Sequence, residues 1–521
     1  MVSKIFHVSG IEINFHDGEK KQSDRIISYD KAIEEIGFGK VQISVIFVTF
    51  LVLANTLSET MGISFVIPAA VCDLQLTPSD KGLLSSMSFL GIMVSSHIFG
   101  FLADTQGRRI VVLSTLLGST ISTVISVFMQ NFIAFLVLRF ISGIFVGGYS
   151  AVMYAYLGEY TASKYRASML TWVTTSVGFV SVAMPLLAFW IMSYSWSYEL
   201  YSGYLFRPWR LLILIYAFPG ILAIICLYKL RESPKLLLSV RKDKEALEVV
   251  KWIFRTNKGK KHGEFDIAGL EPEASEIAVR NVKGIKAIFM SIIDQTLPLL
   301  KPPFVINFTA CCCLHFGLFT CAGGLALFMP DILNKLAIAQ ERTGMDLKVC
   351  DVYNPQFKEV KNVTMTDVIV EECNDRVDLS IYTQTMYVGV GYIIGFIILS
   401  FIIKPSRRTL ILVTTYAIAA IGGLIITFMT SQIAIIGFFT IIIFFAGVNV
   451  PVVNSAAVDI FPTYLRSMAV CCSMLFGRLG TFVSSNIIGI VIENYCQSTF
   501  FSIAGVCIAC CAIAFILPRS K

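Results

Sequence analysis

The sequence is poor in charge and in side chains that bind metals or perform covalent chemistry. Only 15% of its 521 residues are Asp, Glu, Lys or Arg, and five are histidine. Soluble domains carry about 25% charged residues, so the composition excludes a soluble globular protein. No glycine-rich phosphate loop, nucleophile elbow or Cys-x-x-Cys pair with partner ligands is present in the sequence. We therefore expect neither an enzyme nor an ATP-driven pump, and neither a cofactor nor a bound metal.

Long apolar runs take the place of the missing charge. The chain is 55% hydrophobic and has a mean hydropathy of +0.73. The runs are too long and uninterrupted for the strands of a membrane barrel, so they predict an all-α protein embedded in a lipid bilayer. Most of the fourteen cysteines lie inside these runs, where they act as small hydrophobic residues. Twelve spans are expected, at residues 42–68, 81–103, 110–129, 132–156, 169–193, 210–229, 303–329, 381–403, 408–429, 432–457, 467–491 and 498–518.

Lysine and arginine gather in the short loops on one side of these spans, which predicts that both chain ends are cytoplasmic. The same placement in loops argues against a nucleic-acid partner. The expected organisation is a cytoplasmic tail at 1–41 with a short interfacial helix, a six-helix half at 42–229, a cytoplasmic linker at 230–302, a second six-helix half at 303–518 with an extracytoplasmic loop at 330–380, and a short tail at 519–521.

Charged residues recur with a fixed spacing in the two halves. Arg108 and Arg408 precede the third and ninth spans, while Glu159 and Asp459 follow the fourth and tenth. These pairs, and Arg166 with Arg466, are each separated by 300 residues. Three coincidences in matching loops indicate a duplicated six-helix unit.

Several motifs resemble known transporters. GFLADTQGRR at 100–109 is similar to the loop signature of the major facilitator superfamily. RESPKLL after the sixth span resembles a motif of sugar porters and organic ion transporters. GFGKVQ at 37–42, FVIPAAVCDLQLT at 65–77 and RPWRLLILIYAFPGILAI at 207–224 resemble the synaptic vesicle glycoprotein 2 family, although the tail and the outer loop are shorter here. The resemblance implies two six-helix pseudo-repeats that give alternating access to a midplane site.

Three ionisable residues lie deep inside predicted spans, namely Glu59, Arg139 and Arg478. A charge at the bilayer centre costs about 2.5–3.5 kcal/mol on insertion scales, so each should face a cavity or a charged partner. The resemblance places the first, fourth, seventh and tenth spans around the central path. Glu59 would then bind a cation or a proton and Arg478 an anionic group. Arg139 fits equally well as a paired charge that holds helices together.

Weaker candidates for the same path are two amides, a tryptophan and a histidine. Asn449 and Asn454 flank Pro451 in the tenth span, where they would either line a site or form interhelical hydrogen bonds. Trp190 and His315 would be walls of a cavity, with ordinary packing as the alternative.

A set of cytoplasmic charges resembles the inner gate of sugar-porter-like carriers. Such pairs hold while the protein is open outward and break when it opens inward. The alternative is a purely topogenic role. The residues are Asp104, Arg108, Arg109, Glu159 and Arg166 in the first half, and Arg407, Arg408, Asp459 and Arg466 in the second.

The leading interpretation is a secondary active transporter of a small organic solute, either an organic ion or sugar-like, with Glu59 as a site for a cation or a proton. The alternative is a non-transporting membrane glycoprotein of a vesicle or of the cell surface, acting as a scaffold or receptor. Charges retained inside the spans favour transport. Glu59 and Arg478 leave a cation, an anion and a zwitterion open as substrates. We expect a monomer, in the plasma membrane or in a vesicle membrane.

The outer loop carries two expected modifications. Cys350 and Cys373 share this oxidising loop and could form a disulfide. Asn362, in Asn-Val-Thr, is a glycosylation acceptor there, whereas Asn307 in Asn-Phe-Thr lies within a span.

We predict that Asn362→Gln removes the whole mass shift that a glycosidase produces in the wild-type protein. Electrophoresis before and after glycosidase treatment measures this shift. Asn307→Gln is the matched control and should leave the shift unchanged. A shift that persists without Asn362 would refute the predicted orientation of the loop.

Overall fold

The computed structural model describes residues 25–162, 176–201, 203–259, 296–353, 377–402 and 408–517, with isolated positions between 163 and 175, between 265 and 271, and at 293. Four residues with predicted roles lie outside the described residues: Arg166, Asn362, Cys373 and Arg407.

The first half forms six spans. Helix α4 begins with a capping box, in which the Thr77 hydroxyl accepts from the amide of Asp80 and the Asp80 carboxylate accepts from the amide of Thr77. It ends at Gly107, whose φ of +129° allows the tight turn into α5. The helices are α2 (Lys40–Met61) with α3 (Ile63–Ala70), α4 (Pro78–Gln106), α5 (Arg108–Val127), α6 (Phe132–Tyr160), α8 (Ser176–Met192), and α9 (Pro208–Tyr216) with α10 (Phe218–Tyr228).

The second half repeats this arrangement. Its helices are α14 (Val305–Phe319) continued through the π-helical turn η3 (Thr320–Gly324) into α15 (Leu325–Thr343), α17 (Ser380–Ile402), α18 (Arg408–Ile425) with η6 (Ile426–Phe428), α19 (Gln432–Gly447) with α20 (Asn449–Ile460), and α21 (Thr463–Ala514). The backbone at Tyr495 is not helical, with φ −136° and ψ 48°, so α21 contains two spans that meet at a bend. The twelve expected spans are thus confirmed.

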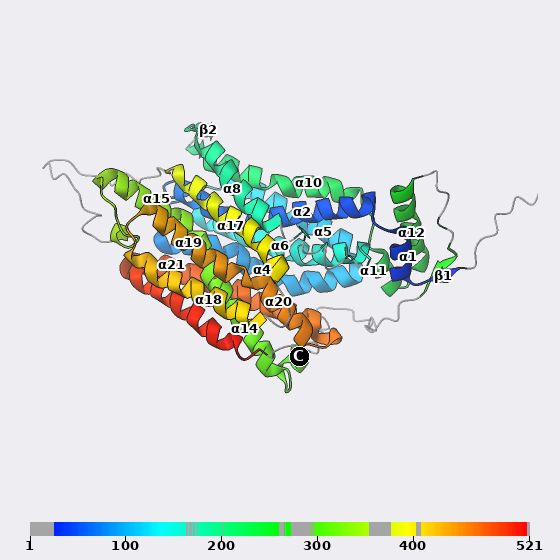
Figure 1. Ribbon diagram of the computed structural model, residues 1–521. Coiled ribbons are helices and arrows are strands. Elements are labelled where there is room, and N and C mark those ends of the chain that lie inside the picture. Colours follow the sequence, from blue (N-terminus) through cyan, green and yellow to red (C-terminus); the bar gives the residue numbers. More distant parts are fainter. Residues whose placement is uncertain are drawn as a thin grey trace, which may run out of the picture.

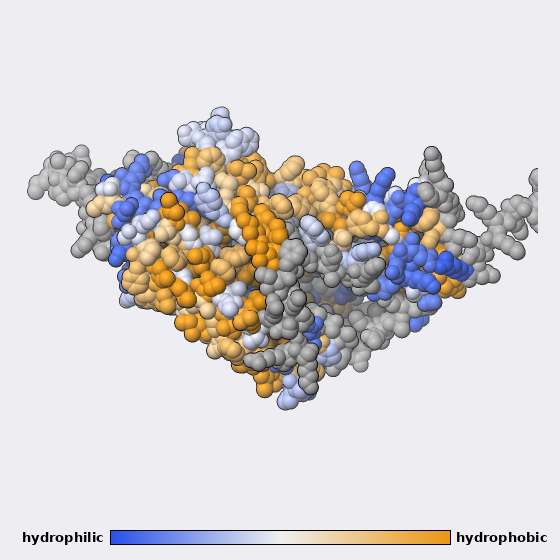
Figure 2. Space-filling model, viewed as in Figure 1, coloured by the Kyte–Doolittle hydropathy of each residue, from blue (hydrophilic) through white to orange (hydrophobic). Residues whose placement is uncertain are grey.

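The surface agrees with a membrane setting. Among the described residues, nine helical segments are long and apolar enough to cross a bilayer, and the last of them, Met468–Ala514, contains both spans of α21. Figure 2 shows apolar side chains over the middle of the molecule and hydrophilic ones toward its two ends. The protein is an integral, multi-pass membrane protein.

The two halves meet at the outer end and diverge toward the cytoplasmic end (Figure 1). Helix α4 of the first half packs on α21 of the second through small residues. The Ser85 and Ser485 hydroxyls are 2.6 Å apart, and the Asn486 amide donates to Ser86 at 2.9 Å. These contacts close the space between the two halves at the outer end.

A small cytoplasmic unit covers the inner end of the first half. It contains α1 (Tyr29–Ile36), α11 (Pro234–Ser239), α12 (Asp243–Lys258), and β1 (Ile26–Ile27) paired in parallel with β4 (Gly269–Leu270). The apolar face of α1 packs on the apolar face of α12, with Ile33 and Val250 both buried. The expectation that α1 lies in the membrane interface is therefore wrong, because protein covers its apolar face. On the outer side, β2 (Tyr198–Tyr201) and β3 (Tyr204–Phe206) form a hairpin.

The disulfide expected between Cys350 and Cys373 is also wrong. Cys350 bonds instead to Cys496, with 5.5 Å between their Cα atoms. The bend of α21 at Tyr495 brings Cys496 beneath the segment that follows α15. Both cysteines lie on the outer side, as the redox argument requires, but the partner is 146 residues away in sequence and not in the same loop.

We predict that digestion without reduction yields a linked peptide pair containing Cys350 and Cys496, and that reduction separates the two peptides. Mass spectrometry of the two digests measures this. The peptide with Cys226, which is a free thiol, serves as the unlinked control. A peptide in which Cys350 is joined to Cys373 would contradict the structure.

Candidate functional site

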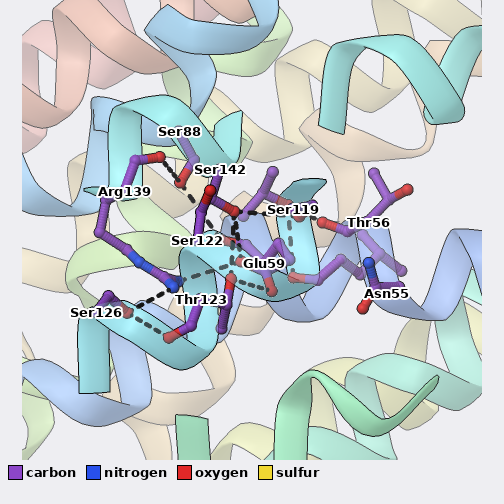
Figure 3. Close-up of polar contacts among 12 residues, drawn as sticks. Asn55, Thr56, Glu59, Ser88, Ser119, Ser122, Thr123, Ser126, Arg139 and Ser142 are labelled. Carbon is purple, nitrogen blue, oxygen red and sulfur yellow. Dashed lines mark hydrogen bonds and ion pairs between the residues drawn. The ribbon is translucent and has the colours of Figure 1, made fainter. Parts of the chain in front are cut away.

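A polar site inside the membrane region is built around Glu59 of α2 (Figure 3). This carboxylate is 3% exposed. Its Oε2 lies 3.2 Å from Nη1 of Arg139 on α6, and it accepts hydrogen bonds from Thr123 of α5 at 2.7 Å and Ser142 of α6 at 2.9 Å. Every charge-bearing atom of Glu59 therefore has a partner from the first half.

Arg139 is held from its other side as well. Its Nη2 donates to the Ser126 hydroxyl at 3.1 Å, and its guanidinium lies 5.7 Å from the ring centre of Phe135. The guanidinium is almost completely buried, with a side-chain exposure of 4%. A buried pair of this kind is costly to desolvate and strongly destabilising to break.

The hydroxyls come mainly from one face of α5. Ser119, Thr123 and Ser126 follow a helical spacing of three to four residues, and Ser119 continues the network to Ser142 at 3.2 Å. Sequence reasoning missed these residues. The signal that could have found them is the density of serine and threonine between residues 114 and 126 of an otherwise apolar span.

A small cavity of about 10 Å³ adjoins the pair, which is room for about one water molecule. Its lining includes Glu59, Arg139, Thr123, Ser58 and Tyr216, all from the first half. This geometry can hold a proton or a water but not an organic solute. Glu59 therefore lies both in a charge pair and at a cavity, and Arg139 is its partner.

Arg478 lies at a second location, between the two halves. From α21 its Nη1 donates to Ser96 of α4 at 2.9 Å. No carboxylate in the described part of the chain forms an ion pair with it. His97, next to Ser96, lies 4.0 Å from the thiol of Cys472. His97 was not predicted, although a histidine in an apolar run is visible in the sequence. Among the described residues, this guanidinium at the interface therefore has a hydroxyl partner but no counter-charge.

The weaker candidates differ in their surroundings. Asn449 is buried, and both the oxygen and the nitrogen of its side-chain amide form hydrogen bonds. The oxygen accepts from Thr415 at 2.8 Å, and the nitrogen donates to the carbonyl of Phe445. This geometry favours the interhelical alternative for Asn449. His315 and Asn454 lie beside each other between α14 and α20. Trp190 is 61% exposed and does not line the Glu59 cavity.

The cytoplasmic charges pair within each half. Arg108 contacts Glu159 at 2.7 Å and Asp104 at 3.3 Å, and Arg408 contacts Asp459. Arg109 donates instead to the carbonyls of Leu227 and Tyr228. No ion pair among the described gate residues joins the two halves, and the side chain of Arg466 is outside the description.

Sequence reasoning also missed Glu232. Its carboxylate accepts from the backbone amides of Arg108 and Arg109 and so caps the start of α5. The motif RESPKLL contains this residue, and the motif therefore ties the linker to the loop that carries the predicted gate.

We predict that Arg139→Met lowers the free energy of unfolding by about 3–5 kcal/mol, because it leaves Glu59 buried without a cation. Thermal unfolding in detergent measures the loss. The double variant Glu59→Gln/Arg139→Met should recover part of it, and Trp190→Phe at an exposed position is the control. A double variant less stable than Arg139→Met alone would contradict the pairing.

Known proteins resemble this chain in sequence and in fold. The sequence profile described as Major Facilitator Superfamily matches residues 48–345, more than half of the chain. Synaptic vesicle glycoprotein 2A of Homo sapiens is 34% identical over 240 residues, which are 46% of this chain and 32% of that protein. Synaptic vesicle glycoprotein 2B of Rattus norvegicus is 29% identical over 325 residues, 58% of this chain and 47% of that protein. The matches thus span less than half the length of these relatives.

Solved structures with the same fold include a D-xylose-proton symporter, with a TM-score of 0.64 at 15% identity, covering 92% of this chain and 99% of that one. The inward-open xylose transporter XylE of E. coli has a TM-score of 0.62 at 15% identity, over 92% of this chain and 96% of that one. At this identity the likeness establishes the architecture of two six-helix halves.

Proposed function

Because the chain belongs to the major facilitator superfamily, we propose that it is a proton-linked secondary transporter of a small organic solute. The two halves would move against each other around a site at their interface. The observation that carries the proposal is the Glu59–Arg139 pair, a fully compensated charge in the membrane region beside a cavity of water size.

In this proposal Glu59 is the carboxylate that binds the proton. Protonation would remove its charge and weaken its contact with Arg139, so α2 and α6 would be free to shift relative to each other. The neighbouring Thr123 and Ser142 hydroxyls can donate to the carboxylate or reorient when it is protonated. One proton would therefore break the ion pair and leave Arg139 without its carboxylate, which would favour a rearrangement of the first half.

The solute would bind nearer to Arg478. Its guanidinium lacks a carboxylate partner among the described residues, and Ser96 and His97 offer further polar atoms from the opposite half. A carboxylate or similar anionic group of the solute would supply the missing counter-charge. Because both halves contribute, binding there would favour a state in which they are close together.

The cytoplasmic charges fit the same cycle. In the present state the Arg108–Glu159 and Arg408–Asp459 pairs lie within separate halves. Closing the cytoplasmic side would bring these two sets toward each other and form the inner gate. The division of the chain into two halves joined by a linker, with α11 and α12 packed on the first half, is part of this proposal.

The second candidate is a non-transporting membrane glycoprotein. The similarity to synaptic vesicle glycoproteins 2A and 2B favours it by name only. The buried Glu59–Arg139 pair favours transport, since apolar side chains at both positions would avoid its desolvation cost.

We predict that purified protein in liposomes accumulates one or more small organic acids from a panel when an inward proton gradient is imposed. Glu59→Gln should reduce gradient-driven accumulation at least tenfold, because it removes the protonatable group, but should leave exchange of labelled for unlabelled solute. Arg478→Met should raise the half-saturating concentration about tenfold, and Arg478→Lys should do so less.

Radioactive solute trapped in the liposomes is the measurement, and empty liposomes give the background. Trp190→Phe is the control variant. If the wild-type protein moves no member of the panel, with or without the gradient, the non-transporting alternative is favoured. If Glu59→Gln keeps full gradient-driven accumulation, the proposed proton site is wrong.

A further inference from the structure

A chain of four charged side chains crosses the outer end of the molecule. Lys81 of α4 lies 2.6 Å from Asp331 of α15, and Lys335 on the same helix lies 3.9 Å from Asp331 and 3.4 Å from Glu493 of α21. The Lys81 and Asp331 side chains are only 8% and 10% exposed. Sequence analysis placed Lys81 at the rim of a span and Asp331 in a loop, and it assigned neither a function.

Only Lys81 comes from the first half of the protein. The other three residues belong to the second half and would move together. In the closed arrangement the two positive and two negative charges balance. When the halves separate on this side, Lys81 loses its carboxylate, and the opposite wall is left with two carboxylates and one ammonium. The Lys81–Asp331 pair is therefore sensitive to the state of the outer side.

The contacts between α4 and α21 beneath this pair are made by small residues. A Cβ on Gly82 would lie 2.8 Å from the carbonyl of Ser485, and a Cβ on Gly489 would lie 2.8 Å from the carbonyl of Pro78. The backbones of α4 and α21 thus touch directly. Glycine and serine are small and do not interlock across the interface as large side chains do. Few side-chain contacts therefore have to be broken when the helices separate.

The second-half wall of this region is held in place by the disulfide. Cys350 and Cys496 join the segment after α15 to the bend of α21, three residues beyond Glu493. Tyr353 from that segment lies with its ring centre 4.9 Å from the Lys335 ammonium. Lys335 therefore touches both segments that the disulfide joins. This wall of the second half therefore presents Asp331 to Lys81, its partner from the first half.

We propose that Lys81 and Asp331 form the outer gate of this protein, a buried ion pair that keeps the outer side closed and whose separation opens it. This rests on the alternating-access part of the proposed function and adds a gate on the side opposite the predicted cytoplasmic one. A buried ion pair suits this task because its attraction is strong where water is excluded. The attraction falls when the two charges separate and become hydrated.

The test measures accessibility and not uptake. Ser485→Cys places a thiol beneath the gate, where the wild-type hydroxyl is buried against Ser85. In intact cells, a membrane-impermeant maleimide should label this thiol at least fivefold faster when Lys81→Met or Asp331→Asn is added. The double variant Lys81→Met/Asp331→Asn should label no faster than the faster single variant, since the two residues make one interaction.

Four controls separate gating from misfolding and from background labelling. Lys81→Arg preserves the ion pair and should keep labelling slow. Arg342→Gln removes a charge elsewhere on α15 and should change nothing. Surface biotinylation confirms that each variant reaches the membrane, and the parent without Ser485→Cys gives the background from native cysteines.

A second thiol reports on the opposite side. Cys471 is exposed and lies on α21 seven residues before Arg478, whose guanidinium contacts Ser96 of the first half, so the two residues share the face of α21 that points to the first half. Its labelling by a permeant maleimide should fall when the gate variants open the outer side. Unchanged labelling of both thiols in surface-expressed gate variants would overturn the gate. Gate variants that label as expected in a protein that moves no solute would instead overturn the proposed transport.

Discussion

The absence of water in the bilayer core is the constraint on which this structure depends, because every charge placed there needs a partner. The described charges inside the spans meet this requirement in three ways. Glu59 and Arg139 compensate each other within one half. Lys81 and Asp331 compensate each other across the two halves. Arg478 has a hydroxyl partner from the opposite half but no carboxylate among the described residues. The three cases therefore differ in the source of the counter-charge, which is the same half, the opposite half, or no described residue.

A charge that is balanced within one half stays balanced while the halves move, so the Glu59–Arg139 pair does not depend on the position of the second half. A charge balanced across the halves is satisfied in one state only, which makes the Lys81–Asp331 contact a determinant of the conformational equilibrium. A charge with no protein counter-charge is satisfied by a bound anion, so Arg478 would link solute binding to the position of the halves. The three arrangements correspond to the proton site, the gate and the solute site that we propose for coupled transport.

The spans and the duplication could be predicted from the sequence, because apolar length and a fixed offset are local or periodic signals. The partners could not. Glu59 and Arg139 are 80 positions apart, Cys350 and Cys496 are 146 apart, and Lys81 and Asp331 are 250 apart. Nothing in periodicity specifies which distant residues meet. The same reason explains the different expectation for α1. Judged from the sequence, its amphipathic face fits a membrane surface and the protein surface of α12 equally well. Only the folded chain decides between them.

The duplicated halves differ at the residues that matter for this division of tasks. With the offset of 300 that aligns Arg108 with Arg408, the positions of Ser119, Thr123, Ser126, Arg139 and Ser142 correspond to Ala419, Gly423, Ile426, Phe439 and Ile442. The polar site of the first half is thus replaced by apolar residues in the second, and Phe439 is completely buried. Helix packing alone does not require the polar set, since the second half builds the same fold without it. Retention of a costly buried pair in one half only is therefore best explained by a task that the first half performs, and proton binding at Glu59 is the task that its geometry suits.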